Sequence, residues 1–231
     1  MPNRRDFLML AGAMPFAGRA MARAPRHTVL GDDFRHGLGK WVVEAQAAST
    51  VTAKGGVLDI DSAEGITLWF RTPIAAPATI EYDVLAVAEG GPHDAVSDVN
   101  AFWMATDPAV SGGSVLARRR SGTFADYDLI RTYYTGIGGN RNTTTRMRRY
   151  IGAAGNRPIL PEHDRSDAAA LLVPNRWIRL KLTADARGAT VERDGVRLFT
   201  FEDAEAYTHG HFGLRTTRSH LRVRNFRIMA A

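Results

Sequence analysis

The sequence contains no cysteine among its 231 residues. Disulfide bonds, thiolate nucleophiles and cysteine-based zinc sites are therefore excluded. A long hydrophobic run is also missing, because the apolar stretch at residues 8–17 is shorter than the roughly 20 residues that a transmembrane helix needs. We therefore expect no stable insertion into a membrane.

The first 24 residues have the character of an export signal and not of a folded domain. Arg4-Arg5-Asp6-Phe7-Leu8 precedes the apolar stretch, and Ala22-Arg23-Ala24 has the small residues that signal peptidase accepts. The arrangement resembles a twin-arginine signal, which directs folded proteins to the twin-arginine export machinery. We expect residues 1–24 to be the signal peptide and residues 25–231 to form one periplasmic or secreted domain.

Helical periodicity of useful length is absent as well, and short strand-like patterns take its place. Residues 79–84 alternate in polarity, residues 57–61 follow a Lys-Gly-Gly turn, and residues 196–201 follow an Asp-Gly turn. About a dozen such segments without a repeating unit are typical of an all-β protein. The sequence predicts a two-sheet jelly-roll sandwich.

Two irregular features are expected within this domain. Leu221 and Val223 have the opposite parity to Phe226 and Ile228, so a β-bulge near Arg224–Asn225 would keep all four on one face. Residues 152–174 carry three prolines among polar residues, which predicts a long loop over one face of the domain.

Positive charge is concentrated in one part of the chain. The formal net charge is +6, but residues 1–24 account for +3 of it. Residues 118–149 hold eight arginines against Asp126 and Asp128, so the remainder of the mature chain is slightly acidic. A concentrated positive field attracts anions. For an exported protein an acidic polysaccharide is a more suitable partner than nucleic acid, and we expect no nucleic-acid binding.

Several stretches resemble a known protein family. "DDFRHGLGKWVVE", "KGGVLDI" and "GITLWF" look like the early strands of bacterial concanavalin-like jelly rolls, and "SDVNAFWMATDP", "YYTGIGGNRNTTTRMRRY" and "GLRTTRSH" are more specific. Together they resemble secreted jelly-roll proteins of unassigned function from bacterial polysaccharide-degradation gene clusters. The resemblance covers the mature chain and implies a jelly-roll fold in a carbohydrate setting. Related folds include polysaccharide lyases, glycoside hydrolases and binding modules, so fold alone does not choose among them.

The segment "TTTRMRRYI" predicts a polar strand face. Because side chains alternate along a strand, Met147 and Ile151 in the core would place a second set of side chains on the opposite, concave face. This set consists of Thr144, Arg146, Arg148 and Tyr150. The preceding loop can bring Arg141 and Asn142 to the rim. Arg131 and Tyr133 share one face of the strand before it, and Tyr134 lies on the other.

Two further segments contribute candidates. In residues 98–105, alternation places Asn100 with Phe102 and Met104 on the concave face, while Trp103 is either a core anchor or a stacking platform for a sugar ring. In residues 209–220, Arg215 and His211 point away from the core and His220 follows at a turn. His209-x-His211 has a spacing that metal sites use, but no third ligand accompanies it, so we expect no metal.

The arginine, asparagine, tyrosine and histidine side chains of these segments suit β-elimination on a uronic acid. Arginine or asparagine would neutralise the substrate carboxylate, and tyrosine or histidine would transfer protons. Glycoside hydrolysis needs two facing carboxylates, and the nearest acids are Asp98, Asp126 and Asp128. The predicted catalytic residues are Tyr134, Tyr133, His220, His211, Arg146 and Asn100. The predicted substrate-binding residues are Arg131, Arg141, Asn142, Arg148, Tyr150, Arg215 and Trp103.

The sequence therefore predicts an exported polysaccharide lyase that acts on a uronate-containing glycan. Two alternatives stay open: a noncatalytic module that binds acidic glycans, and a glycoside hydrolase, including one that acts on 3-keto sugars. No Gly-x-Gly-x-x-Gly motif is present, and we expect no cofactor.

Overall fold

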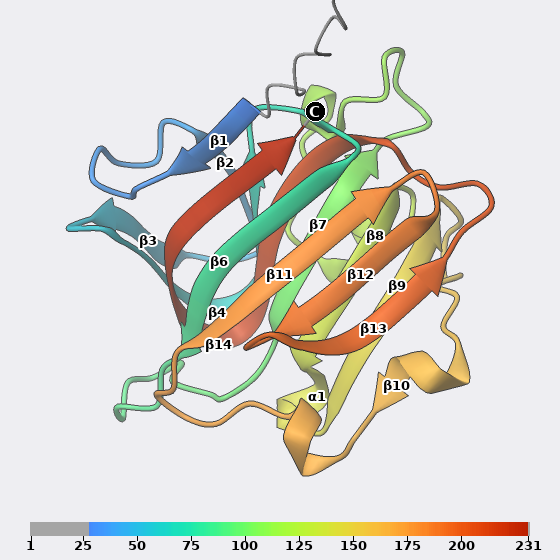
Figure 1. Ribbon diagram of the computed structural model, residues 1–231. Coiled ribbons are helices and arrows are strands. Elements are labelled where there is room, and N and C mark those ends of the chain that lie inside the picture. Colours follow the sequence, from blue (N-terminus) through green and yellow to red (C-terminus); the bar gives the residue numbers. More distant parts are fainter. Residues whose placement is uncertain (1–27, 231) are drawn as a thin grey trace, which may run out of the picture.

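A computed structural model describes residues 28–230 (Figure 1). The predicted signal peptide at residues 1–24 lies outside the described residues. Between residues 28 and 230, none of the helices combines the length and the apolar character that crossing a bilayer requires.

The described chain is almost entirely β-structure. Its strands are β1 (Thr28–Asp32), β2 (Trp41–Ala45), β3 (Ser49–Lys54), β4 (Val57–Phe70), β5 (Ile74–Ala75), β6 (Ala78–Ala86), β7 (Val99–Thr106), β8 (Arg131–Gly138), β9 (Thr144–Ile151), β10 (Asp164–Arg165), β11 (Ile178–Asp185), β12 (Gly188–Arg193), β13 (Val196–Glu202) and β14 (His209–Ala230). Short helical turns are η1 (Val115–Ala117), η2 (Phe124–Tyr127), α1 (Gly139–Asn142), η3 (Pro161–His163) and η4 (Ala168–Ala170).

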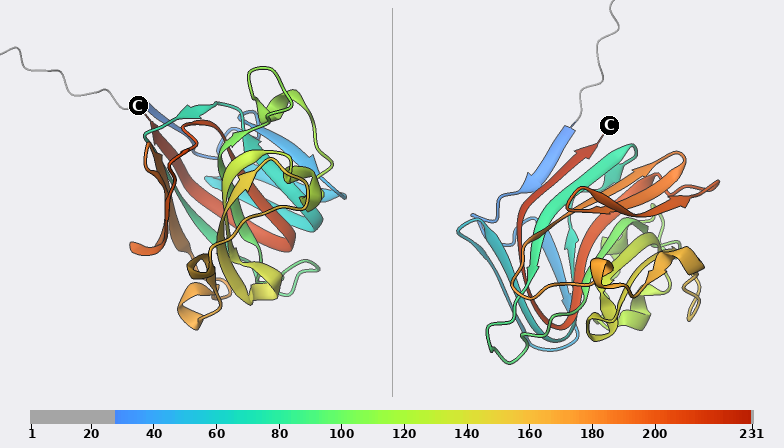
Figure 2. Two further views of the ribbon diagram at one scale, coloured as in Figure 1. Left: turned by 90° about the vertical axis from the view of Figure 1, so that its right-hand side faces the viewer. Right: turned by 60° about the horizontal axis from the view of Figure 1, so that its bottom comes forward.

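The long strand β14 belongs to both layers of the fold. Its first part pairs with β7 and β4, and its last part pairs with β6 and β1, all antiparallel. One layer continues from β7 through β8 and β9, and the other continues from β6 through β11, β12 and β13. Figure 2 shows how the sheet curls so that these two layers face each other.

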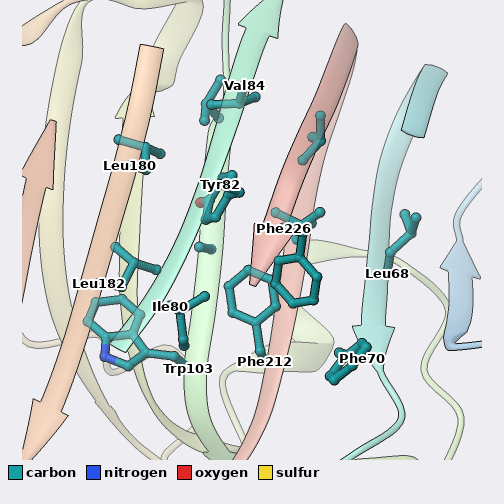
Figure 3. Packing of buried hydrophobic residues seen from close by; sticks show 14 of the residues in the cluster. Leu68, Phe70, Ile80, Tyr82, Val84, Trp103, Leu180, Leu182, Phe212 and Phe226 are labelled. Atoms are coloured by element: carbon teal, nitrogen blue, oxygen red, sulfur yellow. The ribbon is translucent and has the colours of Figure 1, made fainter. Parts of the chain in front are cut away.

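The main core fills the space between the layers (Figure 3). Leu180 and Leu182 of β11 and Trp103 of β7 belong to this core, and Phe212 stacks on Phe226 with ring centroids 5.1 Å apart. Burial of this many large apolar side chains provides the main favourable contribution to folding.

The all-β jelly-roll prediction is confirmed. The residues around the predicted bulge belong to one continuous strand, β14, whose pairing with β6 shifts register between Arg224 and Arg227. Asn225 has a φ of 56° at this shift, so the predicted bulge is present. Residues 152–174 form the expected long connection, interrupted only by η3, β10 and η4.

A second, smaller cluster lies on the other face of the β7–β8–β9 layer. Its buried aromatic side chains are Trp69, Phe102, Tyr127, Tyr134 and Tyr150. The segment that contains η1 and η2 contributes Val115, Tyr127 and Ile130 to this cluster. The η1–η2 segment thus covers one part of the face, and the neighbouring part is left open.

Candidate functional site

A cavity of about 740 Å³ occupies the open part of this face, a volume typical of small-molecule sites. Strand alternation builds its floor, because each floor residue adjoins a core residue in the chain. The pairs are Asn100 and Ala101 in β7, Tyr134 and Tyr133 in β8, and Arg215 and Leu214 in β14. Asn100, Tyr134 and Arg215 are 4%, 7% and 3% exposed, so they form a deep floor.

Asn100 and Arg215 of this floor lie in one row of residues that crosses four strands. The row follows the strand register through Arg215, Asn100, Gly136 and Arg146. Directly opposed residues in antiparallel strands have Cβ atoms roughly 5 Å apart, so their side chains act together. Arg148 lies opposite Tyr134 in the same way.

Gly136 opens a gap in this row. A Cβ atom at this position would lie 2.7 Å from Tyr134 Oη and 2.8 Å from Asn100 Oδ1. Both polar groups therefore converge on the space that a side chain would fill. Asn100 Oδ1 is buried and has no hydrogen-bond partner within residues 28–230. A buried acceptor without a partner is costly, and a ligand donor in the cavity would satisfy it.

Six arginines surround the cavity: Arg141, Arg146, Arg148, Arg157, Arg215 and Arg218. Three of them are paired with carboxylates. Arg146 binds Asp164 through two contacts of 2.8 and 3.0 Å, Arg218 binds Glu64, and Arg157 binds Asp128. In residues 28–230, Arg141, Arg148 and Arg215 form no ion pair, so these three carry the uncompensated positive charge of the cavity.

Arg215 is held by neutral partners. Its Nη1 donates to Thr67 Oγ1 and to the Gly122 carbonyl, both at 2.9 Å. The guanidinium lies 4.8 Å from the Phe124 ring centroid and 4.9 Å from that of Tyr127, and these contacts stabilise the cation. Burial lowers the pKa of Arg215. A buried cation that lacks a carboxylate partner is well suited to receive an anionic ligand.

Two proton-carrying groups share the cavity. Burial, with the nearby charges of Tyr150 and Asp98, raises the pKa of Tyr134 well above its ordinary value. Burial also raises the pKa of Asp98, despite hydrogen bonds from Ser97 and Asn100 that favour the carboxylate. Perturbed pKa values of this kind are common in functional clefts.

Three predicted aromatic site residues do not line the cavity. Tyr133 is fully buried in the main core, where its hydroxyl donates to Asp203, because β8 places it opposite Tyr134. Trp103 is also fully buried and donates to the Thr183 carbonyl, so it is a core anchor and not a stacking platform. Tyr150 lies on the predicted face of β9, away from the main core, but it is fully buried in the second cluster.

The histidines have structural partners outside the cavity. His220 lies between Asp94, at 2.8 Å, and Asp59, at 3.0 Å. His211 is buried between the Phe70 carbonyl and Ser114 Oγ, and burial lowers its pKa. Neither histidine lines the cavity where other predicted site residues meet. Within residues 28–230, no group of three or more histidine, aspartate or glutamate side chains is arranged so that it could hold a metal ion.

Three further predicted substrate-binding residues have different positions. Arg141 lines the cavity as expected. Asn142 does not, because its side chain exchanges hydrogen bonds with the backbone of Leu172. Arg131, at the start of β8, is exposed and outside the cavity. Met104, expected beside Asn100, lies in the main core, since a register shift after Trp103 interrupts the alternation.

Sequence reasoning missed cavity residues that lie outside regular strand alternation. Phe124 and Arg157 belong to segments without a strand pattern, and Arg218 lies at a register shift within β14, so their places depend on tertiary contacts. Phe124 contacts two guanidinium groups, with Arg157 at 4.3 Å and Arg215 at 4.8 Å from its ring centroid. The only local signal was the arginine content of these segments.

Known structures with a similar fold include carbohydrate-related proteins. A protein of unknown function with a galectin-like fold from Bacillus subtilis has a TM-score of 0.62 and 16% identity over 83% of this chain and 90% of its own. A β-1,3-1,4-glucanase (lichenase) from a mouse hindgut metagenome has a TM-score of 0.56 and 11% identity over 88% of this chain and 99% of its own. The carbohydrate-binding module CBM66 from Bacillus subtilis has a TM-score of 0.53 and 12% identity over 81% of this chain and 93% of its own.

These TM-scores show a shared jelly-roll-like fold, and because the identities are so low, the similarity shows nothing more specific. No curated protein matches the sequence. A family model does match residues 60–226, which include the cavity floor and all six of the cavity's arginines. The chain therefore belongs to the family described as "Domain of unknown function (DUF6250)".

Proposed function

We propose that the cavity binds a uronate-containing glycan and cleaves it by β-elimination. The observation that carries this proposal is the placement of Arg148 and Arg215, neither of which is paired with a carboxylate in residues 28–230, beside Asn100 and Tyr134. An arginine-lined cavity suits a carboxylate, because guanidinium groups bind carboxylates through charge-assisted hydrogen bonds. Carbohydrate-related proteins with the same fold add support by analogy.

The proposed reaction needs three contributions from the cavity. Cationic and amide groups neutralise the uronate carboxylate and so make the adjacent C5 proton more acidic. A base removes that proton, and the electron pair of the C–H bond forms the C4–C5 double bond. The C4–O bond breaks as its oxygen accepts a proton. Tyr134, kept protonated by burial, is suited to donate that last proton.

Hydrolysis by a pair of carboxylates has less support. Among residues 28–230, Asp98 is the one carboxylate residue that lines the cavity. Inverting and retaining enzymes ordinarily place two carboxyl groups on opposite sides of the bond. Asp128 and Asp164 lie nearby, but each is engaged by an arginine.

A noncatalytic role in binding acidic glycans is the second candidate. It is favoured by the positions of His211 and His220, which are hydrogen-bonded to other groups and do not line the cavity. The fold shared with a carbohydrate-binding module is consistent with it. In both candidate functions, the glycan binds in the same cavity and contacts the same arginines.

A panel of polysaccharides separates these candidates. The protein is incubated with glucuronan, alginate, pectic and rhamnose–glucuronate glycans while ultraviolet absorbance of unsaturated uronate and reducing ends are both followed. New absorbance supports elimination. New reducing ends without absorbance contradict it and indicate a hydrolase. Binding measured by calorimetry without either product indicates the binding role.

We also propose export through the twin-arginine machinery, on the basis of Arg4 and Arg5 before the apolar stretch. Replacing both with lysine should retain the protein in the cytoplasm of its host. Fractionation followed by immunoblotting measures this, and unchanged export of the double variant would contradict the assignment.

A further inference from the structure

Asp98 is a carboxylate residue of the cavity that the proposed roles leave unused. Its Oδ2 accepts a hydrogen bond from Ser97 Oγ at 2.6 Å, and its Oδ1 lies 3.4 Å from Asn100 Nδ2. Although six arginines line the same cavity, Asp98 forms no ion pair within residues 28–230. The carboxylate is therefore positioned by neutral donors and is not neutralised by a direct cationic partner.

The backbone around Asp98 is held firmly. Its amide donates to the Gly138 carbonyl at 3.1 Å, and Ser97 Oγ contacts the same carbonyl at 3.2 Å. Ser219 of β14 donates to the Ser97 carbonyl at 2.9 Å. Asp98 has a φ of 57°, a region that aspartate and asparagine tolerate better than most residues. Such support is what a preorganised catalytic group needs.

The surroundings also suit proton transfer. Burial raises the pKa of Asp98 above its ordinary value of 3.8, which brings the carboxylate closer to the range in which a general base is effective. Asn100 connects Asp98 to the floor of the cavity, because its amide contacts Asp98 on one side and its Oδ1 adjoins the Gly136 gap near Tyr134 on the other.

Resting on the proposed elimination, we infer that Asp98 is its catalytic base and that Tyr134 is its acid. An Asp98 oxygen takes the C5 proton, the C–H electron pair forms the C4–C5 double bond, and the C4–O electron pair stays on the leaving oxygen. That oxygen accepts the phenolic proton of Tyr134. Proton exchange with water then restores both side chains. Asn100 is a positioning residue in this arrangement, since its amide contacts Asp98 and its Oδ1 adjoins the Gly136 gap.

The first test compares Asp98→Asn with Glu202→Gln, an exposed carboxylate of β13 outside the cavity. Asparagine retains the backbone conformation and removes the base. We expect a loss in kcat of roughly 10²–10⁴-fold with glycan affinity within a few fold, and no change for Glu202→Gln. The wild-type kcat should rise with pH through the raised pKa of Asp98. A kcat for Asp98→Asn within a few fold of the wild type would overturn the inference.

The second test separates base from acid. A uronoside that carries a nitrophenyl ether at O4 releases a leaving group that needs no proton. It should restore turnover in Tyr134→Phe but not in Asp98→Asn, and rescue of Asp98→Asn would overturn the assignment. A wild-type protein that forms no unsaturated product on any glycan would instead refute the proposed elimination itself, and the inference with it. Wild-type turnover retained in Asp98→Asn would refute the inference alone.

Discussion

Tyr133 and Tyr134 are adjacent in β8, yet their hydroxyl groups lie on opposite sides of the sheet. Tyr133 Oη donates to Asp203 Oδ2 at 2.7 Å on the main-core side, whereas Tyr134 lines the cavity. Strand alternation causes this division. One hydroxyl is therefore occupied by a structural hydrogen bond, and the other faces the space where a ligand would bind.

Removing each hydroxyl should consequently have a different effect. Tyr133→Phe deprives the buried Asp203 of a donor, so we expect unfolding to become easier by about 2 kcal/mol while turnover is retained. Tyr134→Phe should leave the unfolding free energy nearly unchanged and reduce kcat on polysaccharide by at least roughly a hundredfold. Denaturant melts and initial rates measure the two effects. Equal losses of activity in both variants would contradict the division.

Gly136 and Gly139 provide a matched pair of cavity glycines. A Cβ at Gly136 would lie 2.7 Å from Tyr134 Oη, whereas its first contact at Gly139 would be 3.5 Å away, with Thr144 Oγ1. Neither residue has a positive φ, so alanine strains neither backbone. We expect Gly136→Ala to displace the floor groups and reduce turnover on the order of a hundredfold, and Gly139→Ala to be tolerated. Similar kinetics for both variants would show that the gap at Gly136 is unimportant.

The strand-derived part of the site could be predicted from the sequence. Alternation around Met147 correctly places Arg146 and Arg148 on the face away from the core, and alternation around Ala101 does the same for Asn100. This works because a strand has only two faces and apolar residues identify the buried one. The same rule fails at Met104, where a φ of 54° accompanies the register shift.

Pairing between distant segments could not be predicted in this way. Of the eight arginines in residues 118–149, Arg118 and Arg120 bind Asp107, and Arg149 binds Asp203. Arg146, expected to neutralise a substrate, is already paired with Asp164. Charge density in a sequence locates a basic region. Tertiary contacts decide which arginines of that region have a carboxylate partner and which do not.

Because Arg146 is paired with Asp164, substitutions of Asp164 and of Arg148 should change the affinity for an acidic oligosaccharide in opposite directions. Asp164→Asn should release Arg146 into the cavity and tighten the binding of an acidic oligosaccharide. Arg148→Met removes a guanidinium that has only the Arg157 carbonyl as a partner within residues 28–230, and should weaken binding by roughly tenfold or more. Calorimetric titrations at low salt measure both. Weaker binding by Asp164→Asn would contradict the view that this carboxylate masks Arg146.

Asp94 and Asp98 lie in the same loop but have opposite pKa shifts. Burial raises the pKa of both, yet at Asp94 it is outweighed by hydrogen bonds from the Gly91 amide and from His220, so the pKa falls to about 2. At Asp98 burial prevails and the pKa lies above 3.8. Ionised Asp94 therefore stabilises the folded state, and ionised Asp98 destabilises it.

The unfolding free energies of Asp94→Asn and Asp98→Asn should accordingly depend on pH in opposite directions. Below pH 3.8, the ordinary value for both groups, Asp98 is protonated in both states, so Asp98→Asn and the wild type should be similar. As the pH rises through the raised pKa, the wild type loses stability relative to this variant. Asp94→Asn should be less stable than the wild type at neutral pH, and the difference should shrink as the pH falls below 3.8 toward about 2. Urea melts across this range measure both differences, and a stabilised Asp94→Asn or a destabilised Asp98→Asn at neutral pH would contradict the assignment of the two carboxylates.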